Sequence, residues 1–154
     1  MTIRSATLIC FLLFTSCGKH VGLPTSHNSA TQDAAKYLRD TSKAIGTFQD
    51  IVMDAHAKNL FSEPDTRTVL EFTTQLNASG QRAILLVRLM EQTGNKDPKD
   101  ALAIMDSITG DLAKLAGGLT IKDDKLRQNV LGTLQLAQAS LNSAKIALLL
   151  RKNP

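Results

Sequence analysis

Aromatic residues are scarce in this sequence. It contains no tryptophan, one tyrosine and five phenylalanines, and two of the phenylalanines, Phe11 and Phe14, lie in an apolar N-terminal segment. A hydrophobic core in the rest of the chain must therefore be built mainly from leucine, isoleucine, valine, alanine and methionine. This composition favours helices over a β-sandwich, which would be richer in aromatic and β-branched residues.

Cysteine is also rare, and its two copies, Cys10 and Cys17, both precede residue 18. The chain beyond them can form no internal disulfide. We therefore expect the domain there to be stabilised by its hydrophobic core alone.

Histidine, a common metal ligand, occurs only at His20, His27 and His56. No H-E-x-x-H, C-x-x-C-H or Glu-x-x-His spacing is present, so zinc, c-type haem and di-iron sites lack ligands. A b-type haem held by His56 and a methionine is an open alternative, but methionine is far more often a core residue. We therefore expect neither a metal nor a cofactor.

Catalytic motifs are absent as well, because the sequence has no G-x-S-x-G, P-loop or G-x-G-x-x-G pattern. Two carboxylate pairs are present, Asp50 with Asp54 and Asp123 with Asp124. The first pair spans one turn of an exposed helical face, and the second lies at a helix start, where acidic residues favour the helix dipole. We interpret both pairs as structural and predict that the protein is not an enzyme.

A continuous run of charge of one sign is missing too. The formal net charge is +4, and Lys122, Lys125 and Arg127 are interleaved with Asp123 and Asp124. Proteins that bind nucleic acid present a continuous basic surface, which this sequence does not encode. The mixed charges are typical of a solvated surface, so nucleic acid is not an expected partner.

The N-terminus has the features of an export signal. Arg4 supplies one positive charge, residues 6–14 form an apolar run, and two small polar residues separate this run from Cys17. As a helix the run would reach about 14 Å at about 1.5 Å per residue, whereas the bilayer core is about 30 Å thick. The pattern predicts a secretory signal peptide over residues 1–16 rather than a membrane-spanning helix.

The segment Phe14-Thr15-Ser16-Cys17-Gly18 resembles the lipobox of bacterial lipoproteins, with Phe14 in the place that leucine usually holds. The resemblance covers residues 1–18 and indicates no family for the chain behind them. It implies that the thiol of Cys17 carries a diacylglycerol and that this residue begins the mature protein. Because several acyl chains form a stable anchor, the resemblance implies a location in the cell envelope: the outer membrane facing the periplasm if the host is diderm.

Residues 18–29 are rich in glycine, proline, serine, asparagine and histidine and show no hydrophobic period. They predict a flexible tether, which reaches about 40 Å when extended at about 3.3 Å per residue. The chain then divides into a signal peptide (1–16), the lipidated cysteine with its tether (17–29) and a helical domain (30–154).

From residue 30 onward, apolar residues recur at steps of three and four, which is typical of amphipathic helices. The first helix is predicted from a capping box at Ser29 to about Leu60, and the second from Ser62 to a stop at Gly94. Their expected core positions are Leu38, Ile45, Phe48, Val52 and Ala55, followed by Val69, Phe72, Leu76, Ala83, Val87 and Met90.

The third helix is predicted from Asp97 as its cap, with Pro98 in the first helical position, to a stop at residues 117–118. The fourth is predicted to open at a Thr-x-x-Asp box from Thr120 to Asp123. Four amphipathic helices with short connections predict an all-α, up-down-up-down antiparallel four-helix bundle. The expected core positions of the last two helices are Ala101, Ile104, Ile108, Leu112 and Leu115, then Leu126, Val130, Leu134, Ala137, Leu141, Ala144 and Leu148.

Two stretches, at the ends of the second and fourth helices, carry apolar residues on nearly every side of the helix. A bundle helix needs only about three apolar positions in seven, and these stretches have more. An up-down bundle would place both ends beside the start of the first helix and the tether. We predict a contact surface there that meets the bilayer, a partner protein or a second copy; a wide apolar face in a well-covered core is the open alternative. The candidate residues are Ile84, Leu85, Leu86, Leu89, Ile146, Leu149 and Leu150.

Together these patterns predict a membrane-tethered cell-envelope lipoprotein that acts without catalysis, as a protein-interaction or assembly module. Its expected partners are the membrane, through the lipid on Cys17, and an envelope protein or a second copy. The alternative is a carrier of a small apolar ligand in the bundle core. A large internal cavity lined by leucine, isoleucine and alanine would favour the carrier, and a tightly filled core would favour the interaction module.

Overall fold

The computed structural model describes residues 29–152, so the predicted signal peptide, Cys17 and residues 18–28 lie outside the described residues. The described chain forms four helices: α1 (Ala30–Ala57), α2 (Glu63–Thr93), α3 (Lys99–Gly118) and α4 (Asp124–Lys152). It contains no strand. The prediction of an all-α domain of four helices is confirmed.

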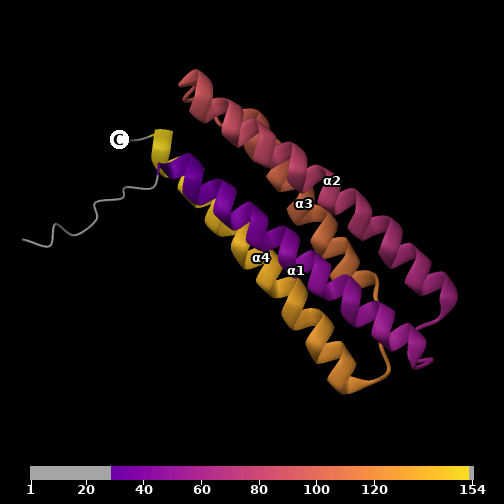
Figure 1. The fold of residues 1–154 in the computed structure, drawn as a ribbon. Helices are drawn as coiled ribbons and strands as arrows, with labels where there is room; N and C mark the ends of the chain where they lie inside the picture. The colour runs from indigo at the N-terminus through magenta and orange to yellow at the C-terminus, as the bar shows by residue number, and fades with distance from the viewer. Residues whose placement is uncertain (1–28, 153–154) are drawn as a thin grey trace, which may run out of the picture.

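Each helix packs against two others, in the pairs α1–α4, α1–α2, α2–α3 and α3–α4. The α1–α4 pair has the most extensive contact and the α3–α4 pair the least. In Figure 1, α1 runs along α4, while α2 and α3 lie on the other side of the molecule. These contacts are compatible with a helical bundle.

Three helix ends meet where the described chain begins. The carboxylate of Glu91, near the end of α2, accepts hydrogen bonds from Ser29 Oγ at 3.2 Å and from Gln32 Nε2 at 3.0 Å. Arg151, near the end of α4, donates from Nη2 to the carbonyl oxygen of Met90 at 3.4 Å. The start of α1 and the ends of α2 and α4 therefore lie together, with the start of α3 close by along the chain. We call this the upper end, after its place in Figure 1, and the opposite end the lower end.

The interior is filled by the residues that the helical period predicted. Every expected core position is buried except Phe72 and Ile104, which are half-buried. Seven buried apolar residues were not among the expected core positions: Ala34, Ala35, Ala44, Phe61, Ile84, Met105 and Ile121. Because the buried seams of all four helices join in one cluster, the fold is held together by aliphatic packing, as the composition predicted.

The predicted limits of α1 and α2 are close to those observed. Ser29 caps α1 by accepting the backbone N–H of Gln32 at 3.3 Å, and Ser62 caps α2 by accepting that of Asp65 at 3.2 Å. The first helix ends at Ala57 instead of near Leu60, because the chain turns there through a left-handed residue, Asn59. Gly94 ends α2 with a φ of 67°, a conformation that glycine adopts without steric cost.

The predicted starts of α3 and α4 are wrong by a few residues. Pro98 takes the cap position of α3, and Asp97 lies one residue further out, where its carboxylate accepts the N–H of Lys99 at 3.1 Å. The cap of α4 is Asp123, whose carboxylate accepts the N–H of Leu126 at 2.6 Å, and Thr120 lies in the preceding connection. That connection is held out of the helix because Ile121, 7 % exposed, packs into the core.

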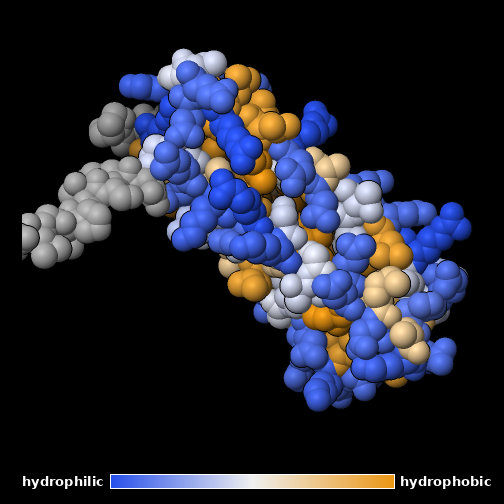
Figure 2. All heavy atoms as spheres, viewed as in Figure 1, coloured by the Kyte–Doolittle hydropathy of each residue, from blue (hydrophilic) through white to orange (hydrophobic). Residues whose placement is uncertain are grey.

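No helix in the described part of the chain combines the length and hydropathy needed to cross a membrane. Most of the visible surface is hydrophilic, and hydrophobic atoms gather in a few places, one of them beside the upper part of α2 (Figure 2).

Candidate interaction surface

Five of the seven residues predicted to form a contact surface are exposed. Their exposed fractions are 49–67 %, which is high for large aliphatic side chains that a bundle would normally bury. These five residues, which we call the apolar set, are Leu85, Leu89, Ile146, Leu149 and Leu150.

The other two predicted residues belong to the core. Ile84 is only 4 % exposed and is part of the core cluster. Leu86 is half-buried and packs against the core cluster. The apolar stretch on α2 therefore has two parts, because Ile84 and Leu86 help to fill the interior while Leu85 and Leu89 point outward.

The distribution of exposed apolar residues along the molecule is uneven. Four further large hydrophobic residues are exposed at other places: Met53, Leu60, Leu131 and Leu136. These residues are isolated from one another along the helices, as is normal on a protein surface. The apolar set, in contrast, falls within the last three turns of α2 and the last two turns of α4.

The two parts of the apolar set lie in separate grooves near the upper end. Arg151 follows Leu150 directly and contacts the carbonyl of Met90, which follows Leu89. The α2 part lines a groove toward α3, together with Arg82 and Ile104. The α4 part lines a second groove toward the start of α1, where Ile146 and Leu150 lie near Ala30 and Tyr37.

Ion pairs are concentrated at the lower end. There Lys58 lies 2.6 Å from Asp54, and Arg127 lies 2.6 Å from Asp124. The pairs of Arg67 with Glu71 and of Lys114 with Asp111 belong to the same end.

In the half of the described domain nearest the upper end, six exposed basic side chains make no ion pair with another described residue. They come from α1, α2, the α2–α3 connection and the start of α3, and we call them the basic set: Lys36, Arg39, Arg82, Arg88, Lys96 and Lys99.

The acidic residues of the upper end have local roles instead. Asp33 and Asp100 lie in the first turns of α1 and α3, where the helix dipole favours a negative charge. Asp97 accepts a backbone N–H at the start of α3, and Glu91 accepts hydrogen bonds from the start of α1. The basic set therefore forms no ion pair with these carboxylates among the described residues.

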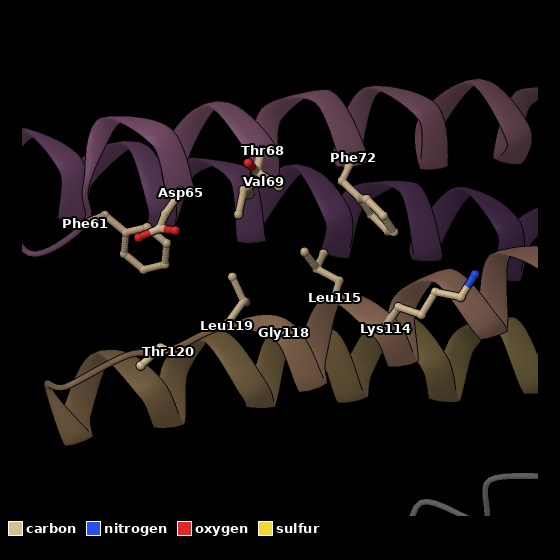
Figure 3. A pocket seen from close by; sticks show the side chains of 10 residues that line it. All are labelled: Phe61, Asp65, Thr68, Val69, Phe72, Lys114, Leu115, Gly118, Leu119 and Thr120. Carbon is tan, nitrogen blue, oxygen red and sulfur yellow. The ribbon is translucent and has the colours of Figure 1, made fainter.

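A different opening lies between α2 and α3 near the lower end. It is a cavity of about 190 Å³ with mainly apolar walls. In Figure 3, Val69 and Phe72 on one wall point toward Leu115 and Leu119 on the other. Gly118 contributes no side chain, which helps to leave the space open.

Sequence reasoning did not find this opening. The glycines at the end of α3 were visible as a helix stop, but the wall opposite them comes from residues about fifty positions earlier. Only the packing of α2 against α3 brings the two walls together.

His56 is engaged at the connection between α1 and α2. Its Nδ1 lies 3.3 Å from the carbonyl oxygen of Phe61, and its Nε2 faces Glu63. The histidine thus links the end of α1 to the connection that follows it. Among the described residues, no group of three or more histidine, cysteine, aspartate or glutamate side chains is arranged to hold a metal ion.

Comparison with known proteins gives no relative for this chain: no protein family, no curated protein and no solved structure matches it.

Proposed function

We propose that this protein is a lipid-anchored component of a bacterial cell envelope that acts as a non-catalytic interaction or assembly module. Residues 1–16 direct its export, the thiol of Cys17 carries the lipid, and residues 18–29 connect the anchor to the helical domain. In a diderm host it faces the periplasm from the outer membrane.

The observation that carries the proposal is the exposed apolar set at the upper end. That end is also where the described chain begins at Ser29, so the tether from Cys17 joins the domain there. A protein whose core is otherwise filled gains nothing in stability from leucines that remain in water. Their retention in one region is typical of a surface that is covered in the working assembly.

For the arrangement of the helices we propose the up-down-up-down antiparallel topology. The contacts of Ser29 and Gln32 with Glu91 fit an antiparallel α1–α2 pair, because the start of one helix meets the end of the other. The contact of Arg151 with Met90 fits a parallel course of α2 and α4. Connections of about five residues between successive helices are of the length that such bundles use.

The lipid anchor is tested with Cys17→Ser in the native host. We expect this variant to lose incorporation of labelled palmitate and to leave the membrane fraction, while the domain stays folded because Cys17 lies outside it. Cys10→Ser is the matched control and should keep both properties, because Cys10 lies within the predicted signal peptide. Membrane retention of the Cys17→Ser protein at the level of the unchanged protein would contradict the anchor.

The interaction role is tested by placing a photo-reactive amino acid at single exposed positions over the described surface, in the living host. We expect protein adducts, with another envelope protein or a second copy, from a contiguous group of positions. Adducts from no position, with the label incorporated and the protein folded, would contradict the role as an interaction module.

A second candidate function is the carriage of a small apolar ligand. The cavity between α2 and α3 favours it, because its volume of about 190 Å³ exceeds the roughly 150 Å³ that suffices for a benzene-sized molecule. The filled core argues against a ligand at the centre of the bundle, where the carrier hypothesis first placed it. We therefore rank the carrier below the interaction module.

The carrier is tested by titration with a fluorescent fatty acid and with a monocyclic aromatic probe. Gly118→Leu should abolish binding, because Gly118 lines the cavity and a Cβ atom there would have no neighbour within 4 Å, so the rest of a leucine side chain has room to occupy the cavity. Gly132→Leu, on the exposed side of α4, is the control and should bind as before. Absence of probe binding to the unchanged protein would exclude this function for these ligand classes.

A further inference from the structure

We infer that the upper end of the domain docks on an anionic phospholipid surface, with the apolar set entering the interfacial region and the basic set lying among the headgroups. This inference rests on the proposed lipid anchor at Cys17. It names the bilayer, rather than a protein or a second copy, as the occupant of the exposed apolar surface.

The first argument is chemical. Peripheral proteins bind membranes by burying leucine and isoleucine side chains in the interface while lysine and arginine attract acidic lipids. The upper end carries both elements on neighbouring surfaces: Arg82 lies in the same groove as Leu85 and Leu89.

The second argument is the contrast between the two ends. At the lower end, four of the six lysine and arginine side chains pair with carboxylates, and only Lys122 and Lys125 form no ion pair with another described residue; the paired side chains are Lys58, Arg67, Lys114 and Arg127. The basic set at the upper end has no such partners among the described residues. A negatively charged surface would supply them, and its field acts within about 8 Å at physiological salt, so the upper end must approach it closely.

The third argument is the position of the anchor. Twelve residues, 18–29, separate Cys17 from the start of α1 at Ala30, so the tether, about 40 Å long when extended, attaches at the same end as the apolar set. Anchoring through a short linker converts docking into an intramolecular step with an effective concentration in the millimolar range. Even a weak affinity of the upper end for lipid would therefore keep it on the bilayer.

Docking in this way would orient the domain. The long axes of α1, α2 and α4 lead from the upper to the lower end (Figure 1), so the lower end and the cavity between α2 and α3 would point away from the membrane. The lower end would then be the part of the domain most accessible to other envelope proteins.

The experiment uses the acylated protein reconstituted in vesicles of phosphatidylethanolamine with phosphatidylglycerol. A single cysteine carrying an environment-sensitive fluorophore is placed at Leu89→Cys or, as the matched control, at Leu60→Cys; both side chains are 52 % exposed, and Leu60 lies at the lower end. We expect a blue shift and quenching by brominated lipid at position 89 and neither change at position 60.

Charge is tested on the same preparation. Arg82→Gln with Arg88→Gln should weaken docking by on the order of tenfold, because each basic residue near an acidic surface contributes to the attraction. Lys122→Gln with Lys125→Gln changes the net charge equally at the lower end and should leave the quenching at position 89 unchanged. Phosphatidylcholine vesicles should weaken the quenching in the same direction as the arginine substitutions.

Three outcomes would overturn the inference. Equal solvent exposure of the labels at positions 89 and 60 on anionic vesicles would show that the upper end stays in water. A blue shift at position 89 that depends on protein concentration and needs no vesicles would assign the surface to a second copy. Mass spectrometry of the same sample shows whether Cys17 carries a lipid. If it carries none, the anchor proposal is overturned and the docking with it. If the protein is lipidated but position 89 stays in water, only the docking is overturned.

Discussion

Lys145 on α4 places its ammonium nitrogen 2.7 Å from Oδ1 of Asp106 on α3, and the same nitrogen lies 2.7 Å from the hydroxyl oxygen of Thr109. The two partners differ in environment, since the side chain of Lys145 is 17 % exposed and that of Asp106 is 71 % exposed. The α3–α4 pair has the least extensive contact of the four helix pairs, and this polar link is part of that contact.

Loss of the carboxylate at position 106 should therefore matter more than loss of an ordinary surface charge. We expect Asp106→Asn to lower the free energy of unfolding by about 1 kcal/mol, because the largely covered ammonium of Lys145 loses its counter-charge; the exposure of Asp106 keeps the cost well below that of a buried pair. Urea denaturation gives the value.

The control for this change is Asp40→Asn. Asp40 pairs with Lys43 at 3.6 Å, and the lysine side chain there is 79 % exposed, so removal of this carboxylate should change stability by less than about 0.5 kcal/mol. Equal costs for the two substitutions would mean that the α3–α4 link is no stronger than a surface pair.

Phe48 is the largest fully buried side chain, with an exposed fraction of 0 %, and it lies in the second half of α1. Phe48→Ala should lower the free energy of unfolding by about 3–5 kcal/mol, because it removes apolar contacts and leaves a cavity in a filled core. Thermal unfolding followed by circular dichroism measures the loss. Met53→Ala, at a side chain that is 44 % exposed on the same helix, should cost far less, and a comparable loss at both positions would contradict the observed orientation of α1.

The start of α4 separates two capping hypotheses. Because the carboxylate of Asp123 accepts the N–H of Leu126, Asp123→Ala should cost about 1 kcal/mol of stability. Thr120→Ala should be close to neutral, since Thr120 lies in the connection and caps no helix. Chemical denaturation of the two variants decides between them, and a larger loss for Thr120→Ala would restore the Thr-x-x-Asp box that the sequence indicated.

Glycines inside the helices offer a test of how closely α1 and α2 approach. Gly132 on α4 has open space at the position of a Cβ atom, so Gly132→Ala should stabilise the protein by about 0.5–1 kcal/mol through helix propensity. At Gly80 on α2, a Cβ atom would lie 3.3 Å from Ser42 Oγ on α1. Gly80→Ala should therefore gain less than Gly132→Ala, because the serine hydroxyl must move.

Larger side chains at the same two positions sharpen the comparison. Gly80→Leu should destabilise the protein by about 1–3 kcal/mol, since it would force α1 and α2 apart, whereas Gly132→Leu should remain harmless. Melting temperatures measured under one set of conditions provide the ranking. A stabilising Gly80→Leu variant would show that the two helices do not pack as closely as described.

Much of the architecture was predictable because helix formation depends on local patterns. Leu134 and Leu141, like nearly every other expected core residue, are buried where the 3.6-residue period placed them. Ser62 and Gly94 limit α2 because a hydroxyl cap and a left-handed glycine act within a few residues. The local pattern predicted the wrong helix start at Thr120. There the burial of Ile121, which is a tertiary contact, keeps the chain out of the helix until Asp124.

The candidate surface was predictable only in part. A stretch that is apolar on every side of a helix shows that more apolar residues are present than the core needs. It does not show which of these residues the core buries. The packing of α2 against its neighbours buries Ile84 and leaves Leu85 outside, although the two are adjacent in sequence and equally apolar.

By itself, the sequence determined the number of helices and most of the residues that fill the core, because each of these depends on residue type and short spacing. Only the tertiary structure decided which apolar residues remain in water, which basic residues lack a carboxylate partner and where α2 and α3 leave a cavity. These properties depend on the distances between side chains far apart in the chain, and such distances are set by the packing of one helix on another.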